Sequence, residues 1–301
     1  MLKLATRGSA LARWQADEIA RLLRRADPDL GIEVVVVETT GDRRQDVPVW
    51  EMGGQGVFVK EVEAAVLDGR ADVAVHSAKD LPSSTAPGLA LAAVPARADA
   101  RDALVGSTLD GLGPGAPIAT GSVRRRAQLA WLRPDLTFVP LRGNIATRLD
   151  RVPLGGAAVV AAAALDRLGL SSRASEVLDV SDVLPQVGQG ALGVECRADD
   201  EAALRMLASI DDVDAHLCVD AERAFLAQLG GGCDLPVGAY ARIERREVSI
   251  EGLIASPDGR VVLRARRGGN LADAPSLASA LAEELLASGG RDLIEIGAAT
   301  A

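Results

Sequence analysis

This sequence contains few of the residues that usually build metal sites or histidine-dependent catalytic centres. It has three cysteines, Cys196, Cys218 and Cys233, and two histidines, His76 and His216. The cysteine number is odd and C-x-x-C spacing is absent, which argues against a disulfide framework and a structural zinc site. Two histidines give little support to a Ser–His–Asp triad or a histidine-rich metal site. We therefore expect no metal and a reducing, cytoplasmic location.

Long apolar segments are also missing. The longest apolar runs, such as residues 157–165, are too short to cross a bilayer. Lys3 and Arg7 come early, but the apolar region of a signal peptide does not follow them. With 301 residues, 48% of them hydrophobic and 25% charged, the chain is typical of a soluble globular protein with two or three domains. We expect no membrane partner.

Lysine is scarce in this sequence. Only Lys3, Lys60 and Lys79 are present, and arginine supplies all the other positive charge. Each lysine is therefore a candidate for a specific role, although a solvated surface charge is the alternative. The net charge of −9 disfavours nonspecific binding to nucleic acid, so we expect no nucleic-acid partner.

The first part of the chain alternates between strand and helix patterns. The apolar run 32–37 predicts a strand buried on both faces. Alternation of this kind indicates a parallel α/β sheet. The predicted elements are a strand at 1–5, a helix that begins after Ser9 and runs to about Ala26, the strand at 32–37, a helix at 58–68 and a strand at 71–76.

A break at residues 96–100 predicts a hinge, and a second α/β unit follows it. Residues 191–196 indicate a strand that returns to the first sheet, which makes the first domain discontinuous. From about residue 213 the pattern changes to a helix, three strands at 237–242, 248–255 and 261–267, and a helix at 275–287. We therefore predict three domains, covering residues 1–95 with 191–208, residues 99–184, and residues 213–301.

Five arginines share one local context, at strand-to-helix turns or in the first turns of helices. Ligands of open α/β sheets bind at the carboxyl ends of strands, where helix N-termini add N–H groups and a positive dipole. Arginine adds a bidentate fork for carboxylates. The group predicts a ligand with many carboxylates or phosphates, although any single member could be a surface charge. The five are Arg7, Arg124, Arg125, Arg142 and Arg148.

Lys79 and Asp80 follow a predicted buried strand. Nearby cations should keep Asp80 ionised, and an ionised carboxylate there could bind N–H donors or stabilise a developing cation. The alternative is an ion pair or a helix cap before Pro82. His76, at the strand end, is interpreted as a structural residue with a hydrogen bond.

Cys233 lies between three glycines and a Pro-Val-Gly sequence. Glycines permit positive φ and leave space for a bulky group, and proline stiffens the segment that follows. This pattern predicts a thiol displayed on a tight loop, while a small buried hydrophobic residue remains the alternative. Residues 43–51 are polar without a period, which predicts a mobile loop that acts as a lid.

Five segments, in this order along nearly the whole chain, resemble the porphobilinogen deaminase family, also called the hydroxymethylbilane synthases. One such segment would be a weak signal, whereas the ordered set is specific. The segments are residues 6–12 (TRGSALA), 75–82 (VHSAKDLP), 141–149 (LRGNIATRL), 187–197 (VGQGALGVECR) and the loop around Cys233.

The resemblance implies two periplasmic-binding-protein-type (type II) α/β domains that form a hinged clamp, plus a small α+β C-terminal domain. It implies a monomeric transferase of tetrapyrrole biosynthesis that deaminates four porphobilinogen molecules and joins them head to tail into linear hydroxymethylbilane, with release of ammonia. The family carries a dipyrromethane cofactor on a cysteine thioether, and Cys233 is the matching position. The growing chain extends from that cofactor and water finally releases it.

By the same resemblance, Asp80 is the catalytic residue, because its carboxylate could hold pyrrole N–H groups and stabilise the cationic azafulvene left by ammonia. Each porphobilinogen brings an acetate and a propionate, which would explain arginines for which the sequence offers no protein partner. The residues assigned to cofactor or substrate binding are Arg7, Ser9, Lys60, Lys79, Thr120, Ser122, Arg124, Arg125, Arg142, Arg148, Arg167 and Gln189.

The chain departs from the family pattern at two positions. Gln55 stands where a lysine is common, and Gly121 replaces a common serine, which puts one cationic contact near the predicted lid in question. Two other functions fit the same residues: a non-catalytic anion-binding or sensor protein with a two-lobed clamp, and a thiol acyltransferase. A pure binding protein has no use for Cys233, and the acyltransferase lacks a histidine near Cys233 in the sequence.

Overall fold

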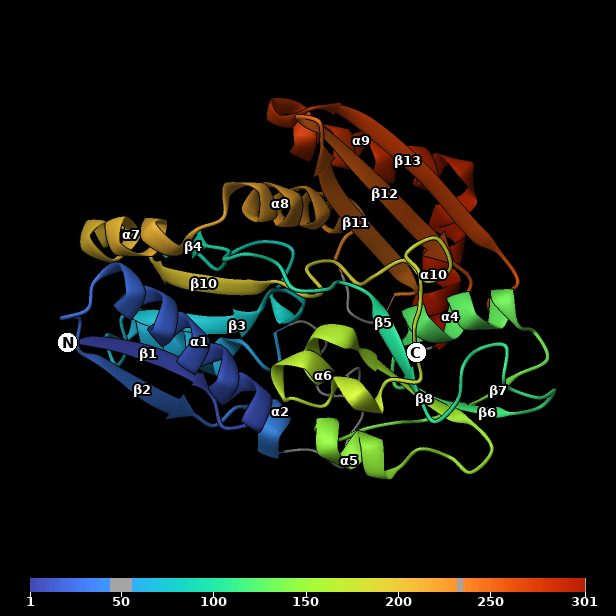
Figure 1. Ribbon diagram of the computed structural model, residues 1–301. Coiled ribbons are helices and arrows are strands. Elements are labelled where there is room, and N and C mark those ends of the chain that lie inside the picture. The colour runs from blue at the N-terminus through green and yellow to red at the C-terminus, as the bar shows by residue number, and fades with distance from the viewer. Residues whose placement is uncertain (44–55, 232–234, 301) are drawn as a thin grey trace.

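The computed structural model describes residues 1–43, 56–231 and 235–300. They form two α/β lobes and a C-terminal α+β unit, which confirms the predicted fold class (Figure 1). Among the helices of these residues, none is both long and apolar enough to span a bilayer.

The first lobe is a five-stranded sheet in the order β2-β1-β3-β10-β4. Strands β1, β2 and β3 are parallel, and β10 runs antiparallel between β3 and β4, so the predicted return of 191–196 to this sheet is confirmed. Its elements are β1 (Leu2–Arg7), α1 (Ala10–Ala26), β2 (Ile32–Val37), α2 (Thr40–Arg43), α3 (Lys60–Leu67), β3 (Val73–Ser77), the 3-10 turn η2 (Ala78–Asp80), β4 (Leu89–Ala93), β10 (Leu192–Arg197), α7 (Glu201–Leu207) and η4 (Ala208–Ile210).

The second lobe repeats this arrangement in the order β7-β6-β8-β5-β9. Three parallel strands are again followed by one antiparallel strand, β5. Its elements are β5 (Asp102–Val105), β6 (Pro117–Ala119), α4 (Val123–Leu132), β7 (Thr137–Val139), α5 (Ile145–Asp150), β8 (Ala157–Ala161), α6 (Ala162–Arg167), η3 (Ser171–Arg173) and β9 (Glu176–Val177).

Two segments connect the lobes. Residues 94–101, here called the first linker, run from β4 to β5, and residues 178–191, the second linker, run from β9 back to β10. Each linker leads into the antiparallel strand of the next sheet. The chain therefore crosses between the lobes twice, which is the connectivity of a hinged clamp.

The C-terminal unit is an antiparallel sheet, β11-β12-β13, packed against helices. At Gly252 of β12, an added Cβ would lie 2.4 Å from the ring of Phe225 on α8 and 3.2 Å from Leu281 on α9, so both helices cover the same face. Its elements are α8 (Val213–Gln228), β11 (Val237–Glu244), β12 (Glu247–Ala255), β13 (Val262–Asn270), η5 (Leu271–Asp273), α9 (Ala274–Leu285), the π-turn η6 (Leu286–Gly290) and α10 (Arg291–Thr300).

The strand predicted at residues 32–37 is present, but its predicted burial on both faces was wrong. The apolar run 32–37 forms β2, but β2 is the edge strand of the first sheet and its Val36 side chain is 50% exposed. An apolar run cannot distinguish a central strand from an edge strand, because that difference depends on the order of strands in the sheet. The sequence also did not predict β4, β5, α7 or α10, which contain short or alanine-rich segments.

Candidate active site

The first lobe holds a pocket at the carboxyl ends of β1 and β3. Arg7 ends β1, and Ser9 caps α1 by accepting a hydrogen bond from the Ala12 N–H at 3.2 Å. After β3, the turn η2 carries Lys79 and Asp80. The pocket, with an empty volume of about 360 Å³, is lined by Arg7, Ser9 and Asp80 together with Leu11, Ala12, Gln15, Phe58, Val75, His76 and Ser77. Three of the predicted site residues therefore meet there.

Two residues of this pocket were missed by the sequence analysis. The Arg7 guanidinium carbon lies 4.1 Å from the centre of the Phe58 ring, within the range of a cation–π interaction. Buried Gln15 donates a hydrogen bond from Nε2 to Ser77 Oγ at 2.7 Å. Phe58 is one of only three phenylalanines in the chain, and it lies two residues after Gly56. That rarity was the available signal.

In the second lobe, Arg124 and Arg125 share one buried carboxylate. Arg124 Nη2 lies 2.6 Å from Asp102 Oδ2, while Arg125 Nε and Nη2 lie 3.0 and 2.7 Å from Asp102 Oδ1. Arg124 also donates to the Leu184 carbonyl and Arg125 to the Val159 carbonyl. The expectation that these arginines lack a protein partner was therefore wrong. The partner was hidden because Asp102 lies on β5, a strand that the sequence did not predict.

This charge cluster stabilises the ionised form of Asp102. Burial alone would raise the pKa of Asp102, but the charges of Arg124 and Arg125 outweigh it and hold that pKa well below its usual range. Burial lowers the pKa of Arg124. Asp102 thus supplies one anion shared by the two cations at the N-terminus of α4. Ser122 caps this helix by accepting the Arg125 N–H at 3.4 Å.

Lys79 and Arg148 face the same cationic surroundings from opposite lobes. Burial, together with the charge of Arg125, lowers the pKa of Lys79 to about 8 and the pKa of Arg148 to about 10. The Asp80 carboxylate acts in the opposite direction on both groups. Cations held this close to one another gain most from a bound anion, so this region is suited to a ligand with carboxylates.

The remaining predicted site residues have different surroundings. Thr120 Oγ1 accepts the Ser122 N–H at 3.1 Å, and half-buried Arg142 is electrostatically coupled to Arg148. Arg167 donates to the Gly190 carbonyl at 2.6 Å, and its guanidinium carbon lies 5.7 Å from the centre of the Trp14 ring on α1. Lys60 begins α3 and is exposed.

His76 is buried beside Glu195, but the structural hydrogen bond predicted for it is not formed at Nε2, which has no hydrogen-bond partner among the described residues. Its Nε2 lies 3.3 Å from Glu195 Oε2 on the neighbouring strand β10, with side chains 3% and 1% exposed. Gly121 also has a structural reason in this chain. A Cβ at this position would lie 2.6 Å from the Leu141 carbonyl oxygen, so the local backbone leaves no room for a serine.

Two cysteines in the described part of the chain are poor nucleophiles. Both side chains are buried, and burial raises the pKa of Cys196 to about 11 and that of Cys218 to about 12. Cys233 and Gln55 lie outside the described residues, as does the predicted lid beyond Arg43. Within residues 1–43, 56–231 and 235–300, no group of three or more His, Cys, Asp or Glu side chains is placed to hold a metal ion.

Comparison with known proteins assigns this architecture to one family. Residues 2–205 match the dipyrromethane cofactor-binding domain of porphobilinogen deaminase, and residues 216–287 match the C-terminal domain of the same enzyme. A porphobilinogen deaminase from Roseiflexus sp. is 49% identical over 298 residues, covering 97% of this chain and 98% of the relative. One from Acidithiobacillus ferrooxidans is 45% identical over 299 residues, covering 98% and 97%.

Among solved structures, a nutrient-binding protein from Burkholderia cenocepacia, bound to methionine, gives a TM-score of 0.42 at 13% identity. The match covers 71% of this chain and 93% of that one. The two family domains together span almost all of the sequence, and the relatives match it over nearly their full length. This chain belongs to the porphobilinogen deaminase family.

Proposed function

We propose that this chain is a hydroxymethylbilane synthase, a transferase that deaminates four porphobilinogen molecules and condenses them head to tail into linear hydroxymethylbilane. The observation that carries this proposal is the position of Asp80. Its carboxylate lines the pocket of the first lobe and lies on the same short turn as Lys79. Family membership and this geometry together disfavour the non-catalytic clamp and the thiol acyltransferase.

Asp80 has the chemistry that the reaction requires. Departure of ammonia from porphobilinogen leaves a positive charge on the pyrrole, and a fixed carboxylate beside it stabilises that charge as it develops. The same carboxylate accepts hydrogen bonds from pyrrole N–H groups and so orients the rings. The walls formed by Phe58, Val75 and Leu11 supply apolar surface for the ring faces.

The acetate and propionate groups of the substrate need cationic partners. Lys79, Arg142 and Arg148 suit this role, because the charges of Lys79 and Arg142 each act against that of Arg148 and a carboxylate bound beside Arg148 relieves this repulsion. Arg7 of the first lobe and Arg167 of the second lobe are two further cationic partners in this proposal. We assign Arg124 and Arg125 a supporting role as well as a binding role, since Asp102 already occupies much of their hydrogen-bonding capacity.

The side chains also fit a dipyrromethane cofactor, which this family's first domain binds. Its carboxylates suit the same cations, and we propose that Cys233 carries it through a thioether. Cys196 and Cys218 are disfavoured because their thiols are buried and hold their protons. When bound, the group supplies the pyrrole carbon to which the first substrate is joined. Ser9, Lys60, Thr120 and Ser122 complete the proposed binding set.

Intact mass spectrometry tests the function and the attachment site together. The purified protein is expected to weigh more than its translated sequence by one dipyrromethane, and peptide mapping is expected to place that mass on Cys233. Cys233→Ser should remove it, whereas Cys218→Ala should retain it. A purified chain with no added mass, which gains none when supplied with porphobilinogen, would refute the proposal.

Three further properties belong to the proposal. We propose a cytoplasmic monomer with no membrane or nucleic-acid partner, since its substrate is a small molecule and its net charge is −9. We propose the domain division at 1–95 with 191–208, 99–184 and 213–301. We also retain residues 43–51 as a proposed lid, which substrate-dependent hydrogen exchange would test.

A further inference from the structure

The second linker packs directly against the turn that carries Lys79 and Asp80. Gly188 has a φ of +70°, and a Cβ there would lie 2.9 Å from the Ala78 carbonyl carbon and 3.0 Å from the Lys79 nitrogen. Gln186 donates from Nε2 to the Lys79 carbonyl at 3.2 Å. A movement of the second linker would therefore displace this turn.

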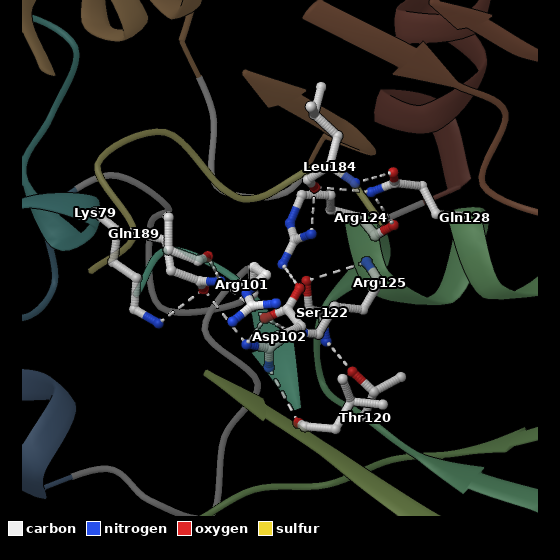
Figure 2. Close-up of polar contacts among 12 residues, drawn as sticks. Lys79, Arg101, Asp102, Thr120, Ser122, Arg124, Arg125, Gln128, Leu184 and Gln189 are labelled. Carbon is white, nitrogen blue, oxygen red and sulfur yellow. Dashed lines mark hydrogen bonds and ion pairs between the residues drawn. The ribbon is translucent and has the colours of Figure 1, made fainter. Parts of the chain in front are cut away.

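Gln189, in the middle of that contact, has four side-chain hydrogen-bond partners and is 0% exposed. Its Nε2 donates to the Ala100 carbonyl at 2.7 Å and to Asp102 Oδ1 at 2.8 Å. Its Oε1 lies 3.4 Å from both Lys79 Nζ and Arg125 Nη2. Figure 2 shows the amide between Lys79 on one side and the Asp102–Arg125 pair on the other.

These partners permit only one orientation of the amide. The opposite orientation would place the NH2 group against two cations and the carbonyl oxygen against two oxygen atoms. The Gln189 amide, which belongs to the second linker, therefore joins the two lobes by hydrogen bonds. It contacts Lys79 of the first lobe and Asp102 and Arg125 of the second lobe. A charged or apolar side chain could not match all four partners.

The two linkers are also joined at this point. Gly190 has a φ of +86°, and a Cβ there would lie 2.5 Å from the Ala98 carbonyl oxygen. Ala98 donates its N–H to the Gly190 carbonyl at 3.1 Å, and Arg97 Nε donates to the Gln189 carbonyl at 2.9 Å. Because both linkers cross between the lobes at these contacts, a rotation of one lobe against the other would strain the contacts that hold Gln189 beside Lys79.

We propose that Gln189 is a positioning residue rather than a ligand-binding residue: it directs the Lys79 ammonium group and couples the relative position of the two lobes to the Lys79–Asp80 turn. This inference rests on the proposed function, because it assigns Lys79 and Asp80 to the reaction. It replaces the substrate-binding role that the family resemblance implied for Gln189, which is fully buried by protein atoms.

The lysine content of the chain gives a direct measurement. With only three lysines, a holoprotein labelled with ¹³Cε-lysine should give three assignable signals, and Lys79→Arg identifies one of them. We expect Gln189→Glu to raise the pKa of Lys79 by about one pH unit, because it places a negative charge beside the ammonium. We expect Gln189→Met to lower it by roughly half a unit, because it removes an acceptor from the charged form.

Steady-state kinetics supply the second readout. A positioning role predicts a fall in kcat of about 10- to 100-fold for Gln189→Met with KM changed by less than about threefold. Gln128→Met is the matched control. Gln128 is also buried, and its side-chain amide accepts the Leu184 N–H and donates to the Leu184 and Arg124 carbonyls, but no hydrogen bond joins it to Lys79 among the described residues. This control is expected to lower thermal stability while leaving the Lys79 titration unchanged.

The possible results distinguish a failure of the inference about Gln189 from a failure of the proposed function. If the Lys79 titration is the same in both Gln189 variants as in the unsubstituted protein, or if KM rises while kcat is unchanged, the inference is overturned. Opposite displacements of the titration support it, and they are measurable even if a variant is inactive. Failure of the unsubstituted holoprotein to form product from porphobilinogen would instead refute the proposed function.

Discussion

Arg97 and Glu222 form a buried ion pair, with Nη1 2.6 Å from Oε1, that joins the first linker to helix α8. Glu222 is 0% exposed and also accepts the N–H groups of Gly188 at 2.7 Å and Ala241 at 2.9 Å. One carboxylate therefore connects both linkers with α8 and β11. The C-terminal unit, which carries Cys233, is fixed to the hinge between the lobes.

Removing the charge of Glu222 should be costly. Glu222→Gln leaves the Arg97 guanidinium buried without its counter-ion, and we expect a loss of about 3–5 kcal/mol in the free energy of unfolding. Urea denaturation measures this loss. Glu201→Gln, which removes an exposed carboxylate paired with Arg205, is the control and should change little. Equal stability of the two variants would contradict the role of this ion pair.

Replacing Asp80 should separate folding from turnover. Asp80→Ala removes the carboxylate of the pocket without deleting an element of the core, so we expect the unfolding midpoint to stay close to that of the unsubstituted protein. Product formation from porphobilinogen should fall by at least about 100-fold, because stabilisation of the developing cation is lost. Asp68→Ala, at an exposed position beyond α3, is the control. Near-normal turnover by Asp80→Ala would exclude Asp80 from its proposed role.

The arginines of the second lobe should fall into two groups. Arg125→Leu leaves Asp102 with one cationic partner fewer inside the lobe, and it should lower the free energy of unfolding by about 3–5 kcal/mol. Arg142→Leu, at a half-buried position, should mainly reduce cofactor loading or early elongation. Denaturation and intact mass, measured on both variants, distinguish the two effects. An Arg142 variant that is fully loaded and fully active would refute its carboxylate-binding role.

The stabilisation supplied by Asp102 should depend on pH in a defined direction. Its pKa is depressed in the folded protein, so its contribution is complete above the unfolded pKa of about 3.9 and is lost as the pH falls towards the folded value. Asp102→Asn should therefore destabilise the protein by a constant amount above about pH 5. The difference should shrink by about 1.4 kcal/mol per pH unit below about pH 3.9. Denaturation at pH 7, 5 and 3 tests this, and a difference that grows on acidification would contradict it.

Local sequence was sufficient for many of the elements and for the family, although it did not predict β4, β5, α7 or α10. The turns after β1 and β3, the caps at Ser9 and Ser122, and the three strands of the C-terminal unit follow from short-range patterns of apolar residues, glycine and capping side chains. The five ordered segments were enough to indicate the family that the domain matches then established. Such patterns persist because capping and turn geometry involve residues close together in the chain.

The tertiary structure alone decided which charges meet. Asp102 and Arg125 are 23 residues apart, Gln189 and Lys79 are 110 apart, and Arg97 and Glu222 are 125 apart. No periodicity records such pairings, because they depend on the order of strands in each sheet and on the two crossings between lobes. The sequence by itself therefore determined that this protein carries clustered arginines and a Lys-Asp turn. Only the fold decided that Asp102 pairs with two of those arginines and that a buried amide connects this group to Lys79.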